Sequence, residues 1–194
     1  MRLLLTRHPV TRANMEGIIE DNFRGEIHGA GYDQIEKLVT RLRLEEIDKL
    51  YSSPAERCVT LAERIAREKG VEPIYNQIFR ELDNGEWFGR KKSEINRLEL
   101  DTHDPTTIKP AGGESLQDLH IRANEAFSYI ERDSPIRGML ISHGWFLKLF
   151  VGNQIGLNIL DAIKNLKFSN CALSEIRKID GGCIVEYLNN RDFL

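Results

Sequence analysis

Two short apolar runs, each leading to a histidine, constrain the fold of this chain more than any other feature. Residues 3–5 are all leucine and lead to Arg7 and His8, and residues 138–141 lead to His143. Apolar runs this short are typical of buried strands rather than of buried helices. In an open α/β sheet the carboxyl ends of the strands form the crevice where ligands bind. The sequence therefore predicts that His8 and His143 meet at one edge of a sheet.

Predicted helices alternate with predicted strands along the rest of the chain, as in an α/β protein. Apolar residues recur at helical spacing from Tyr32 to Leu42 and again from Leu116 to Ile130. A shorter apolar helix is expected over residues 145–151 and a weaker one over 160–166. Further strands are expected at residues 47–51 and 73–78, and a closing hairpin at 171–176 and 183–187.

The tetrapeptide Ser53-Pro54-Ala55-Glu56 carries three signals for the start of a helix. Serine is favoured as the N-cap, proline at the first helical position, and glutamate three residues after the serine completes a capping box. Gly70 then ends the helix. Arg57 is expected in the first turn of this helix, where the free backbone N–H groups favour anions.

An ordered set of motifs extends over most of the chain, and through it the sequence resembles the histidine phosphatase family, also called the phosphoglycerate mutase-like superfamily. Its members in this sequence are Arg7-His8 with Thr11 and Asn14, Tyr51 to Arg57, Arg80 to Gly89, Gly112 to Ser115, and Ser142-His143-Gly144. The resemblance implies a three-layer α/β/α fold with a mostly parallel central sheet. The composition becomes charged and polar over residues 90–113, where we expect a small cap over the site with a short helix near Ser93 to Leu100, within one domain of residues 1–194.

The resemblance implies a role for each of these side chains in phosphoryl transfer. His8 would be the nucleophile that forms a phosphohistidine, while Arg7, Arg57 and His143 would hold the phosphoryl oxygens. The amide of Gly144 and the side chain of Asn14 would add hydrogen bonds to the phosphate, and Thr11 would shape the loop. Arginine suits such a site because its planar fork of donors forms charge-assisted hydrogen bonds with an anion.

Glu81 is the expected proton donor to the leaving group, because a carboxyl in a dry pocket can keep its proton to higher pH than in water. Asp83 and Glu86 are alternatives, since spacing alone does not orient a loop. Two positions depart from the family pattern. Pro9 replaces a glycine and removes one backbone donor beside His8, and Phe88 replaces a common acidic residue and makes the rim of the pocket more apolar.

Hydrolysis of a phosphomonoester is the function we expect, with three alternatives of different kinds. A mutase would pass the phosphoryl group to a second hydroxyl group instead of water, but family mutases of the cofactor-dependent kind have larger insertions before the motif Gly112 to Ser115. A binding module would hold the phosphorylated ligand without turnover. A metal site built on the two histidines conflicts with the neighbouring arginines, so we expect neither a metal nor another cofactor.

Composition limits the partners and the compartment. The net charge of −3 gives no support to nucleic-acid binding, which usually shows as an excess of basic residues. Three cysteines without a Cys-x-x-Cys pair favour free thiols in a reducing compartment, and no apolar stretch reaches the length of a membrane span. We expect a cytoplasmic protein that acts on a small phosphorylated metabolite and forms no membrane contact. The resemblance also allows a homodimer.

Overall fold

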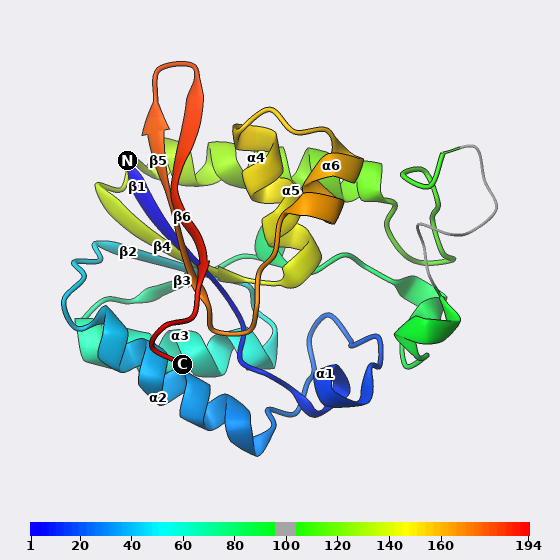
Figure 1. Ribbon diagram of the computed structural model, residues 1–194, viewed down its shortest axis with the longest axis horizontal. Helices are drawn as coiled ribbons and strands as arrows, with labels where there is room; N and C mark the ends of the chain where they lie inside the picture. The colour runs from blue at the N-terminus through cyan, green and yellow to red at the C-terminus, as the bar shows by residue number, and fades with distance from the viewer. Residues whose placement is uncertain (96–103) are drawn as a thin grey trace.

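The computed structural model describes residues 1–95 and 104–194. Its elements alternate between strands and helices, as the sequence predicts (Figure 1). The strands are β1 (Arg2–Arg7), β2 (Lys49–Ser52), β3 (Pro73–Tyr75), β4 (Arg137–Ser142), β5 (Leu173–Ile179) and β6 (Gly182–Asn190). The α-helices are α1 (Arg12–Glu16), α2 (Gly29–Leu42), α3 (Glu56–Lys69), α4 (Leu116–Asp133), α5 (Gly144–Gln154) and α6 (Ile159–Asn165).

The described strands form one sheet in the order β3-β2-β4-β1-β5-β6. The first four are mutually parallel, whereas β5 runs antiparallel to β1, and β6 antiparallel to β5. This arrangement confirms the mostly parallel sheet. Because β1, β4 and β2 are parallel and central, their carboxyl ends lie side by side at one edge.

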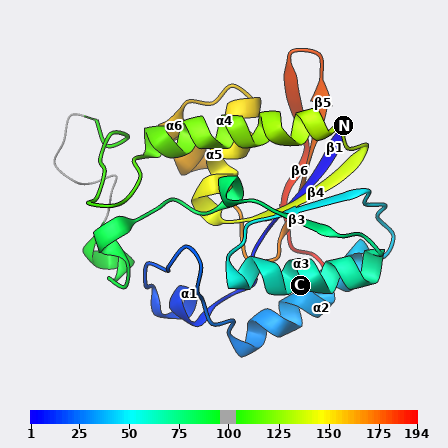
Figure 2. The same cartoon turned by 180° about the vertical axis from the view of Figure 1, so that it is seen from behind.

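Helices cover both faces of the sheet, which confirms the three layers. In Figures 1 and 2, α2 and α3 lie on one face, while α4, α5 and α6 lie on the other. Successive residues of β1 point to opposite faces, as the pleat of a strand requires. Leu4 packs with the side chains of α2 and α3, whereas Leu3 and Leu5 pack with those of α4 and α5. The run of leucines is therefore buried on both sides, which is why it contains no polar residue.

Two predicted boundaries on the amino side of the helices were wrong. The helix expected from Tyr32 begins at Gly29 as α2, and the loop expected around Thr11 contains the short helix α1. Side-chain caps explain both starts, since Thr11 Oγ1 accepts the Asn14 N–H and His28 Nδ1 accepts the Ala30 N–H. Threonine is one of the favoured N-cap residues, and His28 takes the same role because its Nδ1 is an acceptor.

The predicted capping box at Ser53 was also wrong. Helix α3 begins at Glu56 with Ala55 as the N-cap, and no side chain caps it. Ser53 Oγ accepts the Ala55 N–H at 3.3 Å and contacts His143, so its hydroxyl is used before the helix starts. The carboxylate of Glu56 accepts the Gly25 N–H at 3.4 Å. Arg57 nevertheless lies in the first turn of α3, as expected.

The segment that was expected to form a cap is described in part. A 3-10 helix covers Lys92–Glu94, and the rest of the helix predicted from Ser93 to Leu100 falls on residues 96–103, outside the described residues. Backbone hydrogen bonds join this segment to the loop after α1, from Lys92 N–H to Gly17 O at 2.8 Å and from Ile19 N–H to Arg90 O at 2.9 Å. They hold Lys92 beside the carboxyl edge of the sheet.

In the ranges that the structure describes, none of the helices combines the length and the apolar character needed to cross a lipid bilayer.

Candidate active site

Three strand ends meet at the carboxyl edge of the sheet and place the two histidines together. The His8 N–H donates to Ser142 O at 3.0 Å, and the Ser53 N–H donates to Ile141 O at 3.0 Å. The rings of His8 and His143 have their centroids 5.2 Å apart. A cavity of about 690 Å³ opens beside His8, and its lining includes Arg7, His8, Arg57 and Glu81. This volume lies in the range of sites that enclose a whole small ligand.

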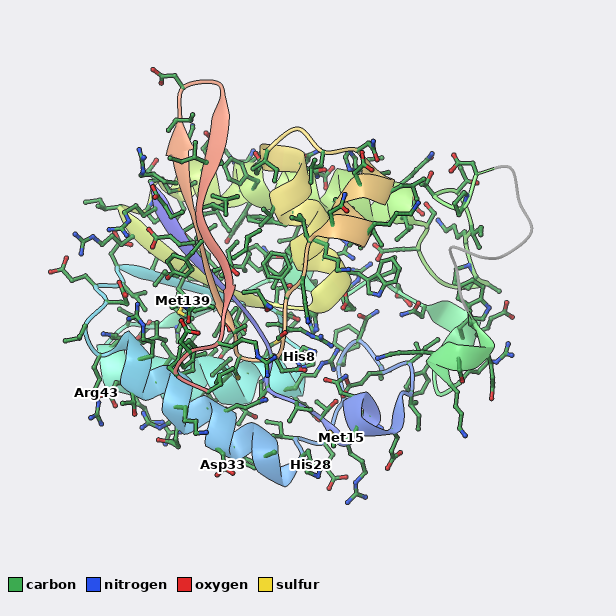
Figure 3. All side chains as sticks on the ribbon, viewed as in Figure 1. His8, Met15, His28, Asp33, Arg43 and Met139 are labelled. Carbon is green, nitrogen blue, oxygen red and sulfur yellow. The ribbon has the colours of Figure 1, made fainter. Side chains whose placement is uncertain are left out.

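His8 lines the cavity, and one of its two ring nitrogens is bonded to the backbone. It directly follows β1, and Figure 3 labels it there. Its Nδ1 lies 2.8 Å from Pro9 O. A carbonyl only accepts hydrogen bonds, so Nδ1 carries the proton and Nε2 keeps its lone pair. Burial, followed by the charges of Arg57 and Arg7, holds the pKa of His8 well below its usual value. His8 is therefore a neutral imidazole with a free Nε2.

Arg7 and Arg57 bring two guanidinium groups to the same place, and each is fixed by backbone carbonyls. Arg7 Nη1 donates to Phe168 O at 3.3 Å. Arg57 Nη1 donates to Asp21 O at 2.9 Å and to Arg24 O at 3.0 Å. The Nε atoms of both arginines are buried without a hydrogen-bond acceptor in the described part of the chain. Burial lowers the pKa of Arg7, with Glu81 and Glu20 opposing the effect. Unsatisfied cationic donors of this kind suit an entering anion.

His143 lies behind Arg57 and has no exposed surface. Arg57 Nη2 lies 3.3 Å from His143 Nδ1, and Ser53 Oγ lies 2.9 Å from His143 Nε2. Burial, followed by the charges of Arg57 and His8, holds the pKa of His143 well below its usual value. The sequence interpretation treats His143 as a cationic donor to phosphate. In the structure it is instead a neutral group that accepts a hydrogen bond from Arg57.

Glu81 lines the cavity at the start of α5. Its Oε1 accepts the N–H groups of Leu82 and Phe146, both at 3.0 Å, and its Oε2 accepts the Trp145 N–H at 3.2 Å. These bonds fix the carboxyl group, and Oε2 keeps a lone pair for a proton. Glu86, one of the two alternatives, is exposed on a 3-10 helix (Gly85–Trp87). The other, Asp83, accepts the Gly85 N–H at 3.0 Å. Neither alternative lines the cavity within the described residues.

The loop that carries Glu81 is held by an ion pair that sequence reasoning did not single out. Arg122 donates from Nη2 to Glu114 Oε2 at 2.7 Å and from Nε to Glu114 Oε1 at 2.9 Å. The same guanidinium group donates to the carbonyls of Ile78, Arg80 and Glu81. Glu114 belongs to the motif Gly112 to Ser115, so this motif acts on the site through Arg122. The only sequence signal was an arginine on the helix that follows Glu114.

Replacing Arg122 by glutamine is expected to lower the free energy of unfolding by about 3 kcal/mol, because it leaves the mostly buried Glu114 carboxylate without its main partner. The measurement is urea unfolding. Arg80→Gln is the matched control, since Arg80 pairs with the same carboxylate at 3.1 Å but is more exposed. We expect the control to lose at most about 1 kcal/mol. Equal losses in the two variants would contradict this account of the loop.

The remaining loop residues form a polar network around the backbone of His8. Asn170 Nδ2 donates to His8 O at 2.9 Å and to Asn14 Oδ1 at 3.1 Å. Glu20 Oε2 accepts from Thr11 Oγ1 at 3.1 Å and lies 3.7 Å from Arg57 Nε. Thr11 shapes the loop, as expected, and Asn14 lines the cavity. Sequence reasoning missed Asn170 and Glu20, which have no motif around them.

The first turn of α5 offers one backbone donor. Gly144 lines the cavity, and its N–H has no acceptor in the described part of the chain. The next two amides, those of Trp145 and Phe146, are taken by Glu81. The rim of the cavity contains Trp87 rather than Phe88, whose side chain is exposed and does not line it. The apolar rim expected at Phe88 therefore comes from its neighbour, because the 3-10 helix turns Trp87 inward.

The pH dependence of stability follows from the two buried histidines. In the unfolded chain a histidine protonates near pH 6.5, whereas His8 and His143 bind protons in the folded chain only well below that pH. As the pH falls below 6.5, the unfolded state gains protons first. The free energy of unfolding is then expected to fall by up to about 1.4 kcal/mol per pH unit for each histidine. Thermal unfolding between pH 7.5 and 5.0 measures it, and a His8→Gln variant should show a smaller slope. An unchanged melting temperature over this interval would contradict the assignment of neutral, buried rings.

Positive charge dominates the lining of the cavity beside His8. Within residues 1–95 and 104–194, no three His, Cys, Asp or Glu side chains are grouped so that they could hold a metal ion. Six cationic side chains line the cavity against two carboxylates among the described residues. They are Arg7, Arg57, Lys92, Lys148, Lys167 and Arg191, facing Glu20 and Glu81. On a chain of net charge −3, this is a strong local excess of positive charge.

Comparison with known proteins identifies relatives over nearly the whole chain. The model of the histidine phosphatase superfamily (branch 1) matches residues 3–191. Among curated proteins, the chain is 29% identical over 185 residues to a protein of Salmonella paratyphi A named probable phosphoglycerate mutase GpmB. That alignment covers 91% of this chain and 84% of the relative.

Solved structures share the fold at lower identity. YhfR of Bacillus stearothermophilus has a TM-score of 0.88 at 23% identity, covering 99% of this chain and 98% of that one. The alpha-ribazole phosphatase of Shigella flexneri has a TM-score of 0.85 at 21% identity, covering 98% and 96%. The mycobacterial glucosyl-3-phosphoglycerate phosphatase Rv2419c has a TM-score of 0.86 at 18% identity, covering 98% and 99%. At these identities the likeness concerns the fold.

Proposed function

The chain belongs to the histidine phosphatase superfamily, and from that premise we propose that it is a metal-independent phosphomonoesterase that works through a phosphohistidine at His8. One observation carries the proposal. His8 is a buried, neutral imidazole whose Nδ1 is committed to Pro9 O, so its Nε2 lone pair is free. It lies in the field of Arg7 and Arg57. A nucleophile beside fixed cations is what transfer of an anionic phosphoryl group requires.

In the first step, Nε2 of His8 attacks phosphorus and the bond from phosphorus to the ester oxygen breaks. The leaving oxygen takes the electron pair of that bond and receives a proton from Oε2 of Glu81. Arg7, Arg57 and the Gly144 N–H bind the three nonbridging oxygens, and Asn14 adds a further donor. His143, once protonated beside the bound phosphoryl group, is the additional cationic donor.

In the second step, water attacks the phosphorus of phosphohistidine and Oε2 of Glu81 takes its proton. The bond from phosphorus to Nε2 breaks, and inorganic phosphate leaves with His8 restored as the neutral imidazole. Glu81 thus works as an acid in one step and as a base in the next. We propose that this chemistry belongs to one domain of residues 1–194, with residues 90–113 as a small cap.

Metal independence is tested by hydrolysis of p-nitrophenyl phosphate with and without EDTA. Because the two guanidinium groups supply the positive charge that a metal would otherwise supply, kcat/KM is expected to be the same in both conditions. A loss of activity in EDTA that returns with a divalent cation would overturn this part of the proposal.

A mutase is the second candidate, and the name of the Salmonella relative favours it. Both activities begin with the same phosphohistidine and differ in whether water or a second hydroxyl group accepts the phosphoryl group. Incubation with 3-phosphoglycerate distinguishes them, since a phosphatase releases inorganic phosphate while a mutase produces 2-phosphoglycerate without net phosphate release.

The cationic side chains beyond the phosphoryl site favour a particular kind of substrate, a small phosphorylated metabolite that carries a second anionic group. Lys92, Lys167 and Arg191 line the cavity and form no ion pair with any carboxylate in the part of the chain that the structure describes. Lys167 directly precedes Phe168, whose carbonyl accepts the hydrogen bond from Arg7. The positive charge of Lys167 therefore lies next to the phosphoryl site. A homodimer, which the resemblance allows, stays a prediction.

We expect Lys167→Met to lower the preference for 3-phosphoglycerate over glycerol 3-phosphate, which lacks the carboxylate. The expected change in the ratio of their kcat/KM values is about tenfold, equivalent to about 1.4 kcal/mol. Lys164→Met is the control, because Lys164 is exposed on α6 and does not line the cavity. The same ratio in both variants would contradict a second anionic group at this position.

A further inference from the structure

Ser53, which directly follows β2, forms a hydrogen bond with the ring of His143. Both residues are fully buried, and Ser53 Oγ lies 2.9 Å from His143 Nε2. On the other side of the ring, Arg57 Nη2 lies 3.3 Å from Nδ1. A guanidinium group only donates, so Nδ1 must be an acceptor and the neutral ring carries its hydrogen on Nε2. That hydrogen is donated to Ser53 Oγ.

We propose that Ser53 is a positioning residue that holds His143 in the tautomer with hydrogen on Nε2, which leaves Nδ1 as the nitrogen that serves the phosphoryl site. The hydrogen bond at one ring nitrogen decides which of the two carries the proton. Without an acceptor at Nε2, the ring can shift its hydrogen to Nδ1, and Nδ1–H would then face the donors of Arg57. Ser53 prevents that arrangement.

The consequence for turnover rests on the proposed function. When a phosphomonoester enters as the monoanion, it gives its proton to Nδ1 of His143 and stays in the site as the dianion. The imidazolium then donates Nδ1–H to a phosphoryl oxygen, and Nε2–H remains bonded to Ser53. Arg57 Nη2, released from Nδ1, turns to the same anion. Ser53 thus stabilises the charged ring through an acceptor that water cannot supply in this buried position.

The groups around His143 make this acceptor important. After burial, the largest influences on the pKa of His143 are the positive charges of Arg57, His8, Arg7 and Arg122, all of which lower it. Cys58 Sγ lies 3.6 Å from Nε2, and burial raises the pKa of this thiol to about 12, so it stays protonated. A thiol is a weak acceptor. Ser53 Oγ is therefore the strong acceptor for Nε2–H among the described residues.

The first test uses the native protein and does not depend on turnover. Nitrogen-15 NMR of the imidazole rings distinguishes protonated from unprotonated nitrogens, and a His143→Gln variant assigns the signals. We expect His143 to carry hydrogen on Nε2 at neutral pH, and Ser53→Ala to shift it toward the form with hydrogen on Nδ1. Hydrogen on Nδ1 in the native protein, or an unchanged spectrum in Ser53→Ala, would overturn the proposal even if the protein is a phosphatase.

The second test follows the pH dependence of kcat for p-nitrophenyl phosphate, because kcat reports the protonation of groups in the enzyme–substrate complex. Loss of the acceptor costs the imidazolium a charge-assisted hydrogen bond, so Ser53→Ala is expected to lower kcat about tenfold and to move the basic limb of the kcat profile down by about one pH unit. Ser52→Ala is the matched control, since its equally buried hydroxyl donates to the Ser53 carbonyl instead. Ser53→Thr, which keeps a hydroxyl, should restore the basic limb. An equal shift in Ser52→Ala would mean that Ser53 acts only on the fold.

Discussion

Replacing His8 by alanine is expected to abolish phosphatase activity, with kcat lowered by at least about 10⁴-fold. The reason is that the two-step reaction begins with attack by Nε2 of His8. Among the described residues lining the cavity, the other groups with suitable lone pairs are the carboxylates of Glu20 and Glu81 and the hydroxyl of Ser169. Glu20 is bound to Thr11 and Arg57, and Glu81 to three backbone amides. The measurement is the steady-state hydrolysis of p-nitrophenyl phosphate.

The control for this variant is His120→Ala. His120 lies on α4 and does not line the cavity, so we expect activity close to that of the native protein. Both variants should give a far-ultraviolet circular dichroism spectrum of the native shape. Residual activity of His8→Ala above about one hundredth of the native value would contradict its assignment as the nucleophile.

Replacing Glu81 by glutamine has the second largest expected effect, and its size depends on the leaving group. An alkoxide leaves only when it is protonated, so kcat for an alkyl phosphate such as glycerol 3-phosphate should fall by about 10²- to 10⁴-fold. The p-nitrophenolate group leaves without a proton, so its transfer to His8 should fall much less. Glutamine is nearly isosteric and keeps an oxygen for the N–H groups of Leu82 and Phe146, so that only the longer bond from the Trp145 N–H is lost.

Pre-steady-state kinetics with p-nitrophenyl phosphate separate the two steps for this variant. A burst of nitrophenol followed by slow turnover is expected, because the second step needs Glu81 as the base for water. Glu86→Gln is the control, since Glu86 is exposed. If Glu86→Gln showed the burst and Glu81→Gln behaved as the native protein, the proton donor would have been assigned to the wrong carboxyl group.

The meeting of His8 and His143 could be predicted from the sequence because it depends on the sheet. Both histidines directly follow buried strands, and β1 pairs with β4 in parallel register up to Arg7 and Ser142. Parallel pairing brings the carboxyl ends of two such strands to the same edge, whatever the loops do. The position of Arg57 in the first turn of α3 was predictable for a related reason, since its helix follows a strand of the same sheet.

The polar contacts of the site could not be predicted in the same way. Asn170 reaches His8 O from 162 positions along the chain, and no periodicity records such a contact. Ser53 has the sequence signature of an N-cap, but its hydroxyl is used by His143 and by the Ala55 N–H. Local propensity predicts what a residue does within its own segment. It carries no information on a partner that the sheet brings from elsewhere.

The same limit applies to Glu114 and Arg122. The motif Gly112 to Ser115 could be recognised as a unit, and Ser115 caps α4 with Asp118 in a capping box. The neighbouring Glu114 instead joins α4 to the loop of Glu81 through Arg122. One motif therefore contains a local capping residue and a long-range ion pair, and only the structure distinguishes them.

The most direct test of the proposed mechanism is to trap the phosphorylated enzyme. Native protein is mixed with p-nitrophenyl phosphate, quenched in alkali within the pre-steady-state burst, and digested for mass spectrometry. We predict a phosphoryl group on His8 that is stable in alkali and lost in acid, absent from His8→Ala and accumulating in Glu81→Gln. Steady turnover of the substrate with no phosphorylated histidine at any quench time, or with the phosphoryl group on another residue, would contradict the account.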